Sequence, residues 1–476
     1  MSETSSISGD AGQDHYYQSS FYDVSKIASP TTKTTYVKKS MLSYFARVNY
    51  SFDSKYLLQA SLRADGSSVL AEGHNWGYFP SVSAGWRINE EAFMAGTSSW
   101  LDNLKLRLSW GVSGNAAVDP YQTLATISSI VPNSTSKAPM TLANKDLTWE
   151  TTSAFNIGVD FGFLNGRISG SAEYYISRTN DLLYYMTAPA ASVYTSTIGN
   201  VGKTKGHGFE LSLNANAVKT KDFAWDVNAS LTLPQDEVVE LYGGVDQVIS
   251  GSEILKIGEP IQAYYQYQIE NCWGIGEFDE YNTKYYNGNF EKPYSDYGNP
   301  GTLKVTDLNG DGKIDADDRK VFQRSPKCIL GLSNTFSYKN FSLSVQMMAR
   351  LGGYMNYAGY GLYTFDNSNW GDLDYWTPEN TNTIIPNPGV SSAAGATYQN
   401  AVRMVKADYF KVKDITLSYD LDKNLLKRAY ISNAKVYCSL KNFISTGKID
   451  GYDSERGGAV TFPLAKQVVV GLNVTF

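Results

Sequence analysis

Residues 153–178 read SAFNIGVDFGFLNGRISGSAEYYISR, and apolar side chains occupy every second position on both sides of Asn165-Gly166. This alternation is typical of β-strands whose two faces meet different surroundings. Asn-Gly is the strongest two-residue hairpin signal, because both residues tolerate a positive φ. The stretch therefore predicts two long antiparallel strands joined by a tight turn. The predicted apolar face carries Phe155, Ile157, Val159, Phe161, Phe163, Ile168, Gly170, Ala172, Tyr174 and Ile176, and the opposite face carries Asn156, Asp160, Ser169, Ser171 and Glu173.

The same alternation recurs along the chain, and it predicts about fourteen strands of this kind. The strands have roughly nine to eleven residues, the length that crosses a bilayer when tilted, whereas strands of soluble sandwiches usually have about five or six. Clear examples lie at 44–52, 56–65, 104–112, 211–217, 225–233, 341–349, 415–421, 434–440 and 468–476.

Short turns and long loops alternate between these strands. The short turns include 53–55 and 164–167, and the predicted long loops are 66–80, 113–148, 179–207, 234–257, 271–327 and 351–407. Outer-membrane barrels have this plan, with short periplasmic turns and long extracellular loops. Only helices and closed barrels satisfy backbone polar groups in lipid. The sequence therefore predicts an all-β, antiparallel transmembrane β-barrel in the outer membrane.

The composition agrees with this prediction and excludes several classes of function. Among the 476 residues, 18% are charged and 13% are aromatic, with 35 tyrosines, and tyrosine and tryptophan form belts at membrane interfaces. The net charge of −6 gives no basic surface for nucleic acid. The three cysteines and three histidines are scattered, so neither a disulfide framework nor a catalytic triad is expected. We expect no enzymatic activity.

Residues 307–318 read DLNGDGKIDADD, which fits the pattern of a calcium-binding loop. Calcium prefers six to eight oxygen ligands, and alternate residues of a tight loop can direct their oxygens inward together. Gly312 stands where the loop turns sharply, and Lys313 would contribute its backbone carbonyl. The alternative is a metal-free turn rich in Asp, Asn and Gly. The predicted ligands of a structural calcium ion are Asp307, Asn309, Asp311, Lys313, Asp315 and Asp318.

Aromatic segments of the loops are candidates for stacking on sugar rings, with packing or membrane-interface roles as the favoured alternative. These segments are WGYF (76–79), YYQYQ (264–268), YGLYTF (360–365) and the run from Trp370 to Trp376.

Several segments are specific enough to identify a family. They include 62–94 (LRADGSSVLAEGHNWGYFPSVSAGWRINEEAFM), 307–322 (DLNGDGKIDADDRKVF), 374–386 (DYWTPENTNTIIP), 409–421 (YFKVKDITLSYDL) and 470–476 (VGLNVTF). On these segments, the chain from about residue 40 to its end resembles the C-terminal barrel portion of SusC/RagA-type TonB-linked outer-membrane transporters. The resemblance implies a barrel of about 22 strands, an N-terminal plug inside it, a TonB-box, and a SusD-like surface lipoprotein over the extracellular mouth. It also implies oligosaccharide or peptide substrates.

Residues 1–42 match nothing in this pattern, and residues 43–476 are expected to form the barrel, with loop 271–327 carrying the calcium motif. A signal peptide, plug and TonB-box are not recognised, so we expect a truncated product that would contact the TonB complex through the missing N-terminal region. The terminal Phe476 resembles the barrel-assembly signal of outer-membrane proteins. Two alternatives stay open: an extracellular carbohydrate-binding or carbohydrate-active β-protein, and a passive porin.

Overall fold

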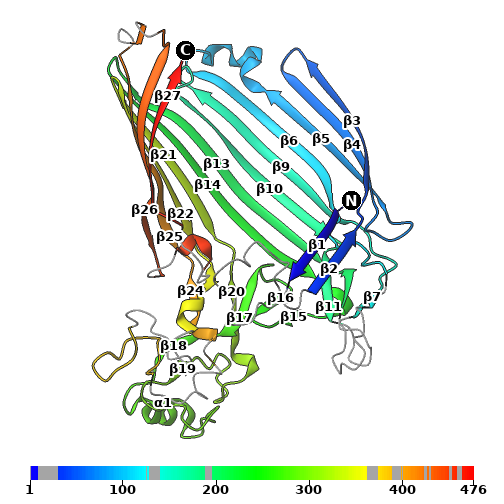
Figure 1. Cartoon of the computed structure of the whole chain (residues 1–476), viewed down its shortest axis with the longest axis vertical. Helices are drawn as coiled ribbons and strands as arrows, with labels where there is room; N and C mark the ends of the chain where they lie inside the picture. The colour runs from blue at the N-terminus through cyan, green and yellow to red at the C-terminus, as the bar shows by residue number, and fades with distance from the viewer. Residues whose placement is uncertain are drawn as a thin grey trace.

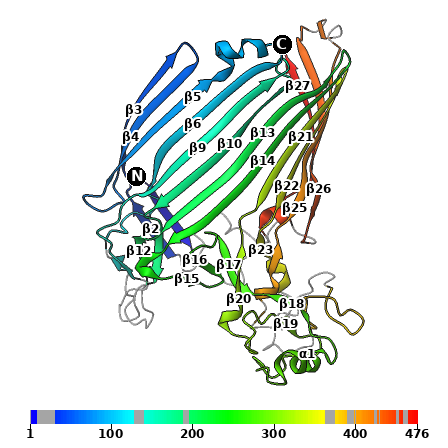
Figure 2. The same ribbon diagram turned by 180° about the vertical axis from the view of Figure 1, so that it is seen from behind.

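A large antiparallel sheet of thirteen strands dominates the computed structural model of this chain (Figure 1). The structure describes residues 2–8, 31–124, 126–127, 140–187, 196–361, 374–388, 398, 400–422, 426–427, 430–449, 453–457 and 464–476. The sheet curves into a trough-shaped wall, which Figure 2 shows from behind. No helix within these ranges is long and apolar enough to span a membrane.

Each wall strand pairs with the wall strands next to it along the chain, in the order β27-β26-β25-β22-β21-β14-β13-β10-β9-β6-β5-β4-β3. The all-β antiparallel prediction is confirmed. The wall strands are β3 (Met41–Phe52), β4 (Tyr56–Ser67), β5 (Trp76–Arg87), β6 (Leu101–Asn115), β9 (Glu150–Phe163), β10 (Ile168–Asn180), β13 (Lys203–Lys219), β14 (Phe223–Glu240), β21 (Cys328–Tyr338), β22 (Phe341–Leu351), β25 (Tyr409–Asp420), β26 (Asn433–Gly447) and β27 (Gln467–Thr475).

The predicted hairpin forms β9 and β10, with Phe163 opposite Ile168 in the register. Asn165 and Gly166 have φ values of 57° and 74°, the left-handed conformation that this turn requires. Leu164 shares this conformation, with a φ of 59°. The Asn-Gly signal thus places the turn correctly.

The two ends of the wall differ. Short connections join β3 to β4, β9 to β10, β13 to β14 and β21 to β22 at one end, where the chain also finishes (Figure 1). The connection from β5 to β6 at this end contains the 3-10 helices η2 (Ile88–Glu90) and η3 (Ala92–Thr97). The long connections all leave the other end, as the loop asymmetry predicts.

One part of the predicted loop plan needs correction. The sequence pattern separates loops 234–257 and 271–327, but β14 continues to Glu240 and residues 241–327 form a single connection to β21. The strands within this connection are too short to cross a bilayer. These are β15 (Gln247–Ser250), β16 (Glu253–Lys256), β17 (Ala263–Tyr267), β18 (Ile269–Cys272), β19 (Leu303–Val305) and β20 (Arg319–Gln323), and the wall sheet has thirteen strands where the alternation predicts about fourteen.

The remaining elements lie outside the wall sheet, mostly in its long connections. They are β1 (Ser2–Ser8), β2 (Thr31–Val37), β7 (Thr126–Ile127), β8 (Met140–Leu142), β11 (Leu183–Thr187), β12 (Ser196–Asn200), η4 (Tyr242–Gly244), α1 (Glu277–Tyr286), η5 (Ala316–Asp318), β23 (Tyr354–Asn356), η6 (Ala358–Gly361), β24 (Met404–Lys406) and η7 (Ser454–Arg456). β1 and β2 form a two-stranded sheet of their own.

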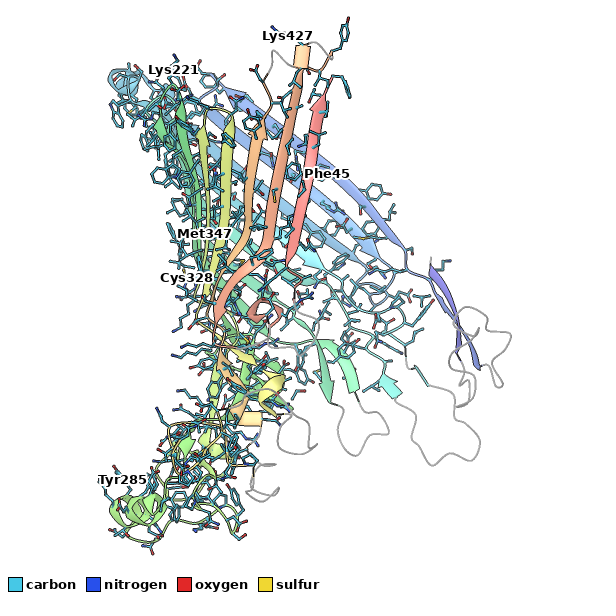
Figure 3. The ribbon with its side chains drawn as sticks, turned by 60° about the vertical axis from the view of Figure 1, so that its left-hand side comes forward. Phe45, Lys221, Tyr285, Cys328, Met347 and Lys427 are labelled. Atoms are coloured by element: carbon cyan, nitrogen blue, oxygen red, sulfur yellow. The ribbon has the colours of Figure 1, made fainter. Side chains whose placement is uncertain are left out.

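The long connections build a compact unit at the lower end of Figure 1, which we call the loop domain: residues 263–323 with 374–388, 398 and 400–402. Its core is aromatic and excludes water. Tyr285 on α1 marks this end in Figure 3, and Lys221 and Lys427 mark the opposite, short-turn end of the wall. The buried core residues are Tyr267, Cys272, Trp273, Phe278, Phe290, Tyr297, Leu303, Val305, Ile314, Trp376, Tyr398, Ala401 and Val402.

Candidate functional site

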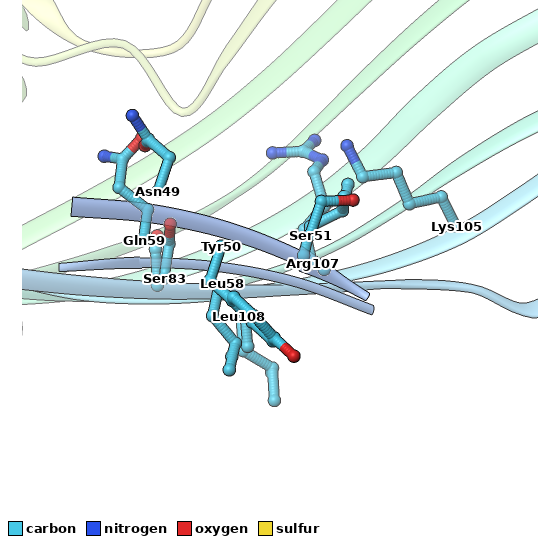
Figure 4. Close-up of a pocket in the computed structure, with 13 residues that line it drawn as sticks. Asn49, Tyr50, Ser51, Leu58, Gln59, Ser83, Lys105, Arg107 and Leu108 are labelled. Atoms are coloured by element: carbon cyan, nitrogen blue, oxygen red, sulfur yellow. The ribbon is translucent and has the colours of Figure 1, made fainter. Parts of the chain in front are cut away.

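The two faces of the wall differ in chemistry, as a barrel with a polar interior requires. In Figure 4 the side chains of Tyr50, Leu58 and Leu108 point to one side of the sheet, and those of Asn49 and Gln59 point to the other. Leu58 and Leu62 are about half exposed (51% and 50%), although they are large and apolar. Such a face suits lipid rather than water, and we call it the outer face.

A pocket of about 470 Å³ lies against the polar, inner face of β3–β6 (Figure 4). Its polar lining residues are Asn49, Ser51, Gln59, Ser83, Lys105, Arg107 and Ser109. All of these positions except Ser83 belong to the polar faces that the alternation at 44–52, 56–65 and 104–112 predicts. The pocket therefore offers hydrogen-bond donors and acceptors toward the barrel interior.

A cluster of charges crosses three strands beside this pocket. The Arg107 guanidinium donates from Nε to Asp160, at 2.9 Å from Oδ2, and its Nη2 lies 3.3 Å from Glu173 Oε2. Lys105 Nζ is 4.0 Å from the same Asp160 carboxylate. Sequence reasoning places these residues on polar faces but does not pair them, because β6 and β9 are separated by a long connection.

Aromatic side chains gather on the outer face near the short-turn end. Trp100 stacks on Phe163 with ring centroids 6.1 Å apart, and Trp225 stacks on Phe336 at 5.6 Å. The Trp225 indole N–H donates to Asn334 Oδ1 at 3.1 Å, which satisfies a polar group on the lipid side. This arrangement matches the predicted belt at the membrane interface.

The predicted calcium loop lies in the loop domain, between β19 and β20. Its side-chain oxygens accept backbone N–H groups, as Asx turns do. Asp307 accepts from Gly310 N at 2.6 Å and from Gly312 N at 2.8 Å. Asn309 accepts from Asp311 N at 3.0 Å, and Asp311 accepts from Lys313 N at 3.1 Å. The loop thus has a defined fold built by its own acidic residues.

Asp318 closes this loop and is fully buried. Its two oxygens accept from Leu308 N and Asp315 N, both at 2.8 Å. Burial raises the pKa of this carboxyl and the neighbouring charge of Asp307 adds to the rise, outweighing the backbone donors that lower it. A buried carboxylate beside a second one is costly unless a cation compensates it.

Lys313 is the cation that the chain itself supplies here. Its ammonium lies 3.0 Å from Asp315 Oδ2 and 3.7 Å from Asp311 Oδ2. Within the described residues, no three His, Cys, Asp or Glu side chains converge closely enough to hold a metal ion. The six predicted ligands lie in one loop. Calcium binding there stays a prediction.

The loop packs directly on the aromatic core. A Cβ added at Gly312, where φ is 84°, would meet the Tyr286 ring at 3.1 Å, and Glu291 N donates to Gly312 O at 2.7 Å. Its conformation is therefore coupled to α1 and the core beneath it.

The aromatic loop segments mostly serve packing. Phe79 is buried against Trp149, with centroids 5.3 Å apart, and Tyr267 packs edge-on against Tyr398 at 4.9 Å. Trp76 stacks on Tyr44 at 6.0 Å. Residues 362–373, which include Trp370, lie outside the described residues.

Comparison with known proteins agrees with this geometry. The family model described as TonB dependent receptor-like, beta-barrel matches residues 3–442. TonB-dependent receptor P26 of Formosa agariphila is 31% identical, and the match covers 91% of this chain and 46% of that protein. TonB-dependent receptor SusC of Bacteroides thetaiotaomicron is 28% identical, over 92% of this chain and 44% of that protein.

Among solved structures, the RagAB peptide importer in its closed-closed state superposes with a TM-score of 0.75 at 25% identity, over 95% of this chain and 49% of the importer chain. The chain thus spans about half the length of the relatives it matches. The curved antiparallel wall agrees with the β-barrel that this family model is named for. The chain belongs to the TonB-dependent receptor β-barrel family, with SusC/RagA-type relatives, and is an outer-membrane protein.

Proposed function

We propose that this chain forms the C-terminal part of the barrel wall of an importer that carries oligosaccharides or peptides across the outer membrane. The observation that carries the proposal is the pairing of a lipid-suited outer face with a polar inner face on strands of membrane length (Figure 4). In this role the chain performs no covalent chemistry. One relative is a peptide importer, which supports peptide substrates. The resemblance to SusC/RagA-type transporters supports oligosaccharides.

The proposal includes two protein partners. A SusD-like surface lipoprotein would cover the long-loop end, where the loop domain lies. Energy would come from the TonB complex through a region N-terminal to this wall. Relatives named TonB-dependent receptors support this energy source.

The two alternatives predict different behaviour. An extracellular carbohydrate-active protein would be soluble and would act on its substrate, whereas a barrel extracts with outer-membrane detergent fractions and changes gel mobility on heating. A passive porin would carry solute without TonB.

The test of import uses the full-length gene in its own cells. We expect deletion to abolish growth on one class of oligosaccharide or peptide, and loss of TonB to have the same effect. Uptake that continues unchanged without TonB would favour the passive porin and sink the proposal.

We further propose that residues 307–318 bind one structural calcium ion that stiffens the loop domain. The donor set supports this: Asp307, Asn309, Asp311, Asp315 and Asp318 offer hard oxygen ligands in one tight loop, and Lys313 would add its carbonyl. Asp318, buried with its pKa raised, gains most from a cation.

Protease resistance of the loop domain tests the calcium proposal. We expect millimolar calcium to slow cleavage of the loop domain, and Asp318→Asn to remove that protection. Asp279→Asn on the exposed side of α1 is the matched control, because it removes a carboxylate outside the loop. Equal cleavage with calcium and with chelator would rule the ion out.

A further inference from the structure

A second pocket, of about 310 Å³, lies at the long-loop end of the wall, between the segment that follows β10 and the connection that follows β14. Figure 1 places β15 and β16 beside β11, and Figure 2 shows β12 next to them. Six of the twelve residues that line this pocket are leucine, isoleucine or valine, and four are polar or charged. A mostly apolar lining with a few polar groups is typical of ligand pockets. We call it the mouth pocket.

The hairpin of β15 and β16 supplies one side of the mouth pocket. Its register places Val248 opposite Leu255 and, two positions further along, Ser250 opposite Glu253. Residues opposite one another on antiparallel strands point to the same face, and so do alternate residues of one strand. The four side chains therefore share one face of the hairpin, and all four residues line the pocket.

The segment that follows β10 supplies the other side, with Leu182, Leu183 and Tyr184. Val201 N donates to Leu182 O at 2.7 Å, and Leu183 N donates to Glu150 Oε2 at 2.9 Å. Leu183 also packs against the buried apolar cluster at this end of the wall. These contacts hold the segment in place, so the mouth pocket is formed before any ligand arrives.

An ion pair lies beside the aliphatic lining. Arg324 Nη1 donates to Glu253 Oε1 at 2.8 Å, and the guanidinium lies over the Tyr264 ring, with Cζ 4.9 Å from its centroid. Arg350 Nη2 donates to Arg324 O at 2.6 Å, which fixes the backbone of this arginine from the wall. The side chains of the pair are 38% and 58% exposed, and an ion pair this exposed adds little to stability. Both charged groups therefore remain accessible to a ligand.

This lining suits a peptide better than a sugar. Sugar rings bind through flat C–H faces that stack on aromatic rings, and Tyr184 is the one aromatic side chain among the described residues of the pocket. Branched aliphatic residues instead favour burial of an apolar side chain. Each unit of a peptide also carries an N–H donor and a C=O acceptor beside its side chain. An arginine next to a glutamate offers a partner to each.

We propose that the mouth pocket is a peptide-binding subsite, in which an apolar side chain of the peptide lies against Leu182, Val248 and Leu255. Arg324 donates to a carbonyl oxygen of the bound peptide, and Glu253 accepts from one of its N–H groups or from its α-ammonium group. The inference rests on the proposed import function only for delivery of the bound peptide into the barrel. Binding itself is tested on the protein alone.

The first experiment measures which compounds the purified full-length protein retains in detergent. The probes are a mixture of random hexapeptides and a mixture of linear glucose oligosaccharides, and mass spectrometry identifies what stays bound. We expect peptides that contain leucine, isoleucine, valine or phenylalanine to be retained about tenfold more than peptides without them, because burial of one such side chain contributes about a tenfold step in affinity or more.

Substitutions at Val248 assign this binding to the mouth pocket. Val248→Asp places a charge among the aliphatic side chains, and Val248→Phe fills space in the pocket without adding charge. Each should lower retention of the apolar peptides about tenfold. Ile249→Asp is the matched control, because it adds the same charge on the opposite face of β15, at a position 44% exposed. Equal retention by Val248→Phe and its parent would overturn the subsite, as would retention of oligosaccharides in place of peptides.

A substitution at Arg324 tests the polar part of the subsite. Arg324→Met removes the guanidinium donors but keeps a long side chain, so retention should fall while the preference for apolar peptides persists. Lys320→Met, which removes an exposed lysine of β20 that bonds Gln268, is the control and should change nothing. Heat-modifiable gel mobility checks that each variant forms the barrel. A fall of equal size in both variants would show general attraction by charge and contradict the contact to Arg324.

Uptake in cells separates the subsite from the import function. We expect Val248→Phe to slow the TonB-dependent uptake of an apolar hexapeptide that the parent retains, and Ile249→Asp to leave uptake unchanged. Equal uptake by Val248→Phe and its parent would overturn the subsite and leave the import function standing. If the parent binds the peptide at Val248 but takes none of it into the cell, the import function fails and the subsite stands.

Discussion

The wall and the loop domain are built by one chain for two different solvents. Within the described residues, the wall strands leave large apolar side chains such as Leu332 and Val82 39% and 49% exposed on their outer face. The loop domain encloses an aromatic core of its own, in which Trp273 and Tyr297 are fully inaccessible. The comparison teaches that the wall depends on lipid for the burial that the loop domain achieves by itself.

The largest expected effect comes from the core of the loop domain. Trp273 packs edge-on against Phe278 at 5.2 Å and Tyr297 at 5.7 Å, so Trp273→Ala should destabilise the loop domain by about 3–5 kcal/mol. Limited proteolysis should then cleave residues 263–323, while heat-modifiable gel mobility of the wall stays normal. Ile275→Ala, at a position 73% exposed, is the control. Simultaneous loss of the wall would show that the two regions are not independent.

A charge on the outer face should produce the next largest effect, and only in the wall. Leu332→Arg places a cation against lipid near the middle of β21, at a cost of about 2–4 kcal/mol. The neighbouring Ser333→Arg faces the polar interior and should cost far less. Denaturant unfolding in detergent or lipid compares the two, and equal destabilisation would contradict the assignment of the faces.

Tryptophan-to-phenylalanine substitution separates the regions more finely. Trp225→Phe leaves Asn334 without its donor on the lipid side, which should cost about 1–3 kcal/mol. Trp273→Phe loses no hydrogen bond, because the Trp273 indole N–H has no partner within the described structure. Unfolding measurements should therefore show a larger loss of stability for Trp225→Phe, in the wall, than for Trp273→Phe, in the loop domain. A larger loss for Trp273→Phe would argue against the Asn334 contact.

The smallest effect is a pH dependence in the loop domain. The pKa of Glu277 lies below its ordinary value. Burial alone would raise this pKa, but hydrogen bonds from Lys304 and from Gly274 N, together with the Lys304 charge, outweigh burial and lower it. A lowered carboxyl pKa gives stability that is present above about pH 4.3 and is lost as the pH falls through the folded-state value. Because Glu277 is partly exposed, the loss should stay under about 1 kcal/mol. Proteolysis between pH 7 and pH 3 should show this slope, and Glu277→Gln should flatten it.

The sequence pattern predicts the wall well, because the polarity of each wall residue indicates whether it faces lipid or the barrel interior. The outward Leu58 and the inward Gln59 differ in kind, and neighbouring strands follow one another along the chain. The tight turn at Asn165-Gly166 is equally local. None of these features depends on knowing which distant residues meet.

The long connections are less predictable, because their contacts join segments far apart. Short strands such as β17 alternate like wall strands, so the pattern divides residues 241–327 wrongly. The pairing of Lys411 with Asp453 and Glu455 spans more than forty residues, and no local signal marks it. The calcium loop is recognisable from spacing alone, but its position on the aromatic core depends on Tyr286 and Gly312 meeting in three dimensions.

The neighbour-only order of the wall strands has a consequence for how such a protein changes over generations. The hairpin is the unit from which the wall is built. A break in the chain at the long-loop end, between two hairpins, leaves the residue pairing between the wall strands unchanged. The tight turns at the opposite end keep each hairpin in phase. Recombination at the long-loop end can therefore exchange the connections from β14 to β21 and from β22 to β25, which together build the loop domain, and leave every inward and outward side chain of the wall in place. Such an exchange separates the evolution of the loop domain from that of the membrane wall.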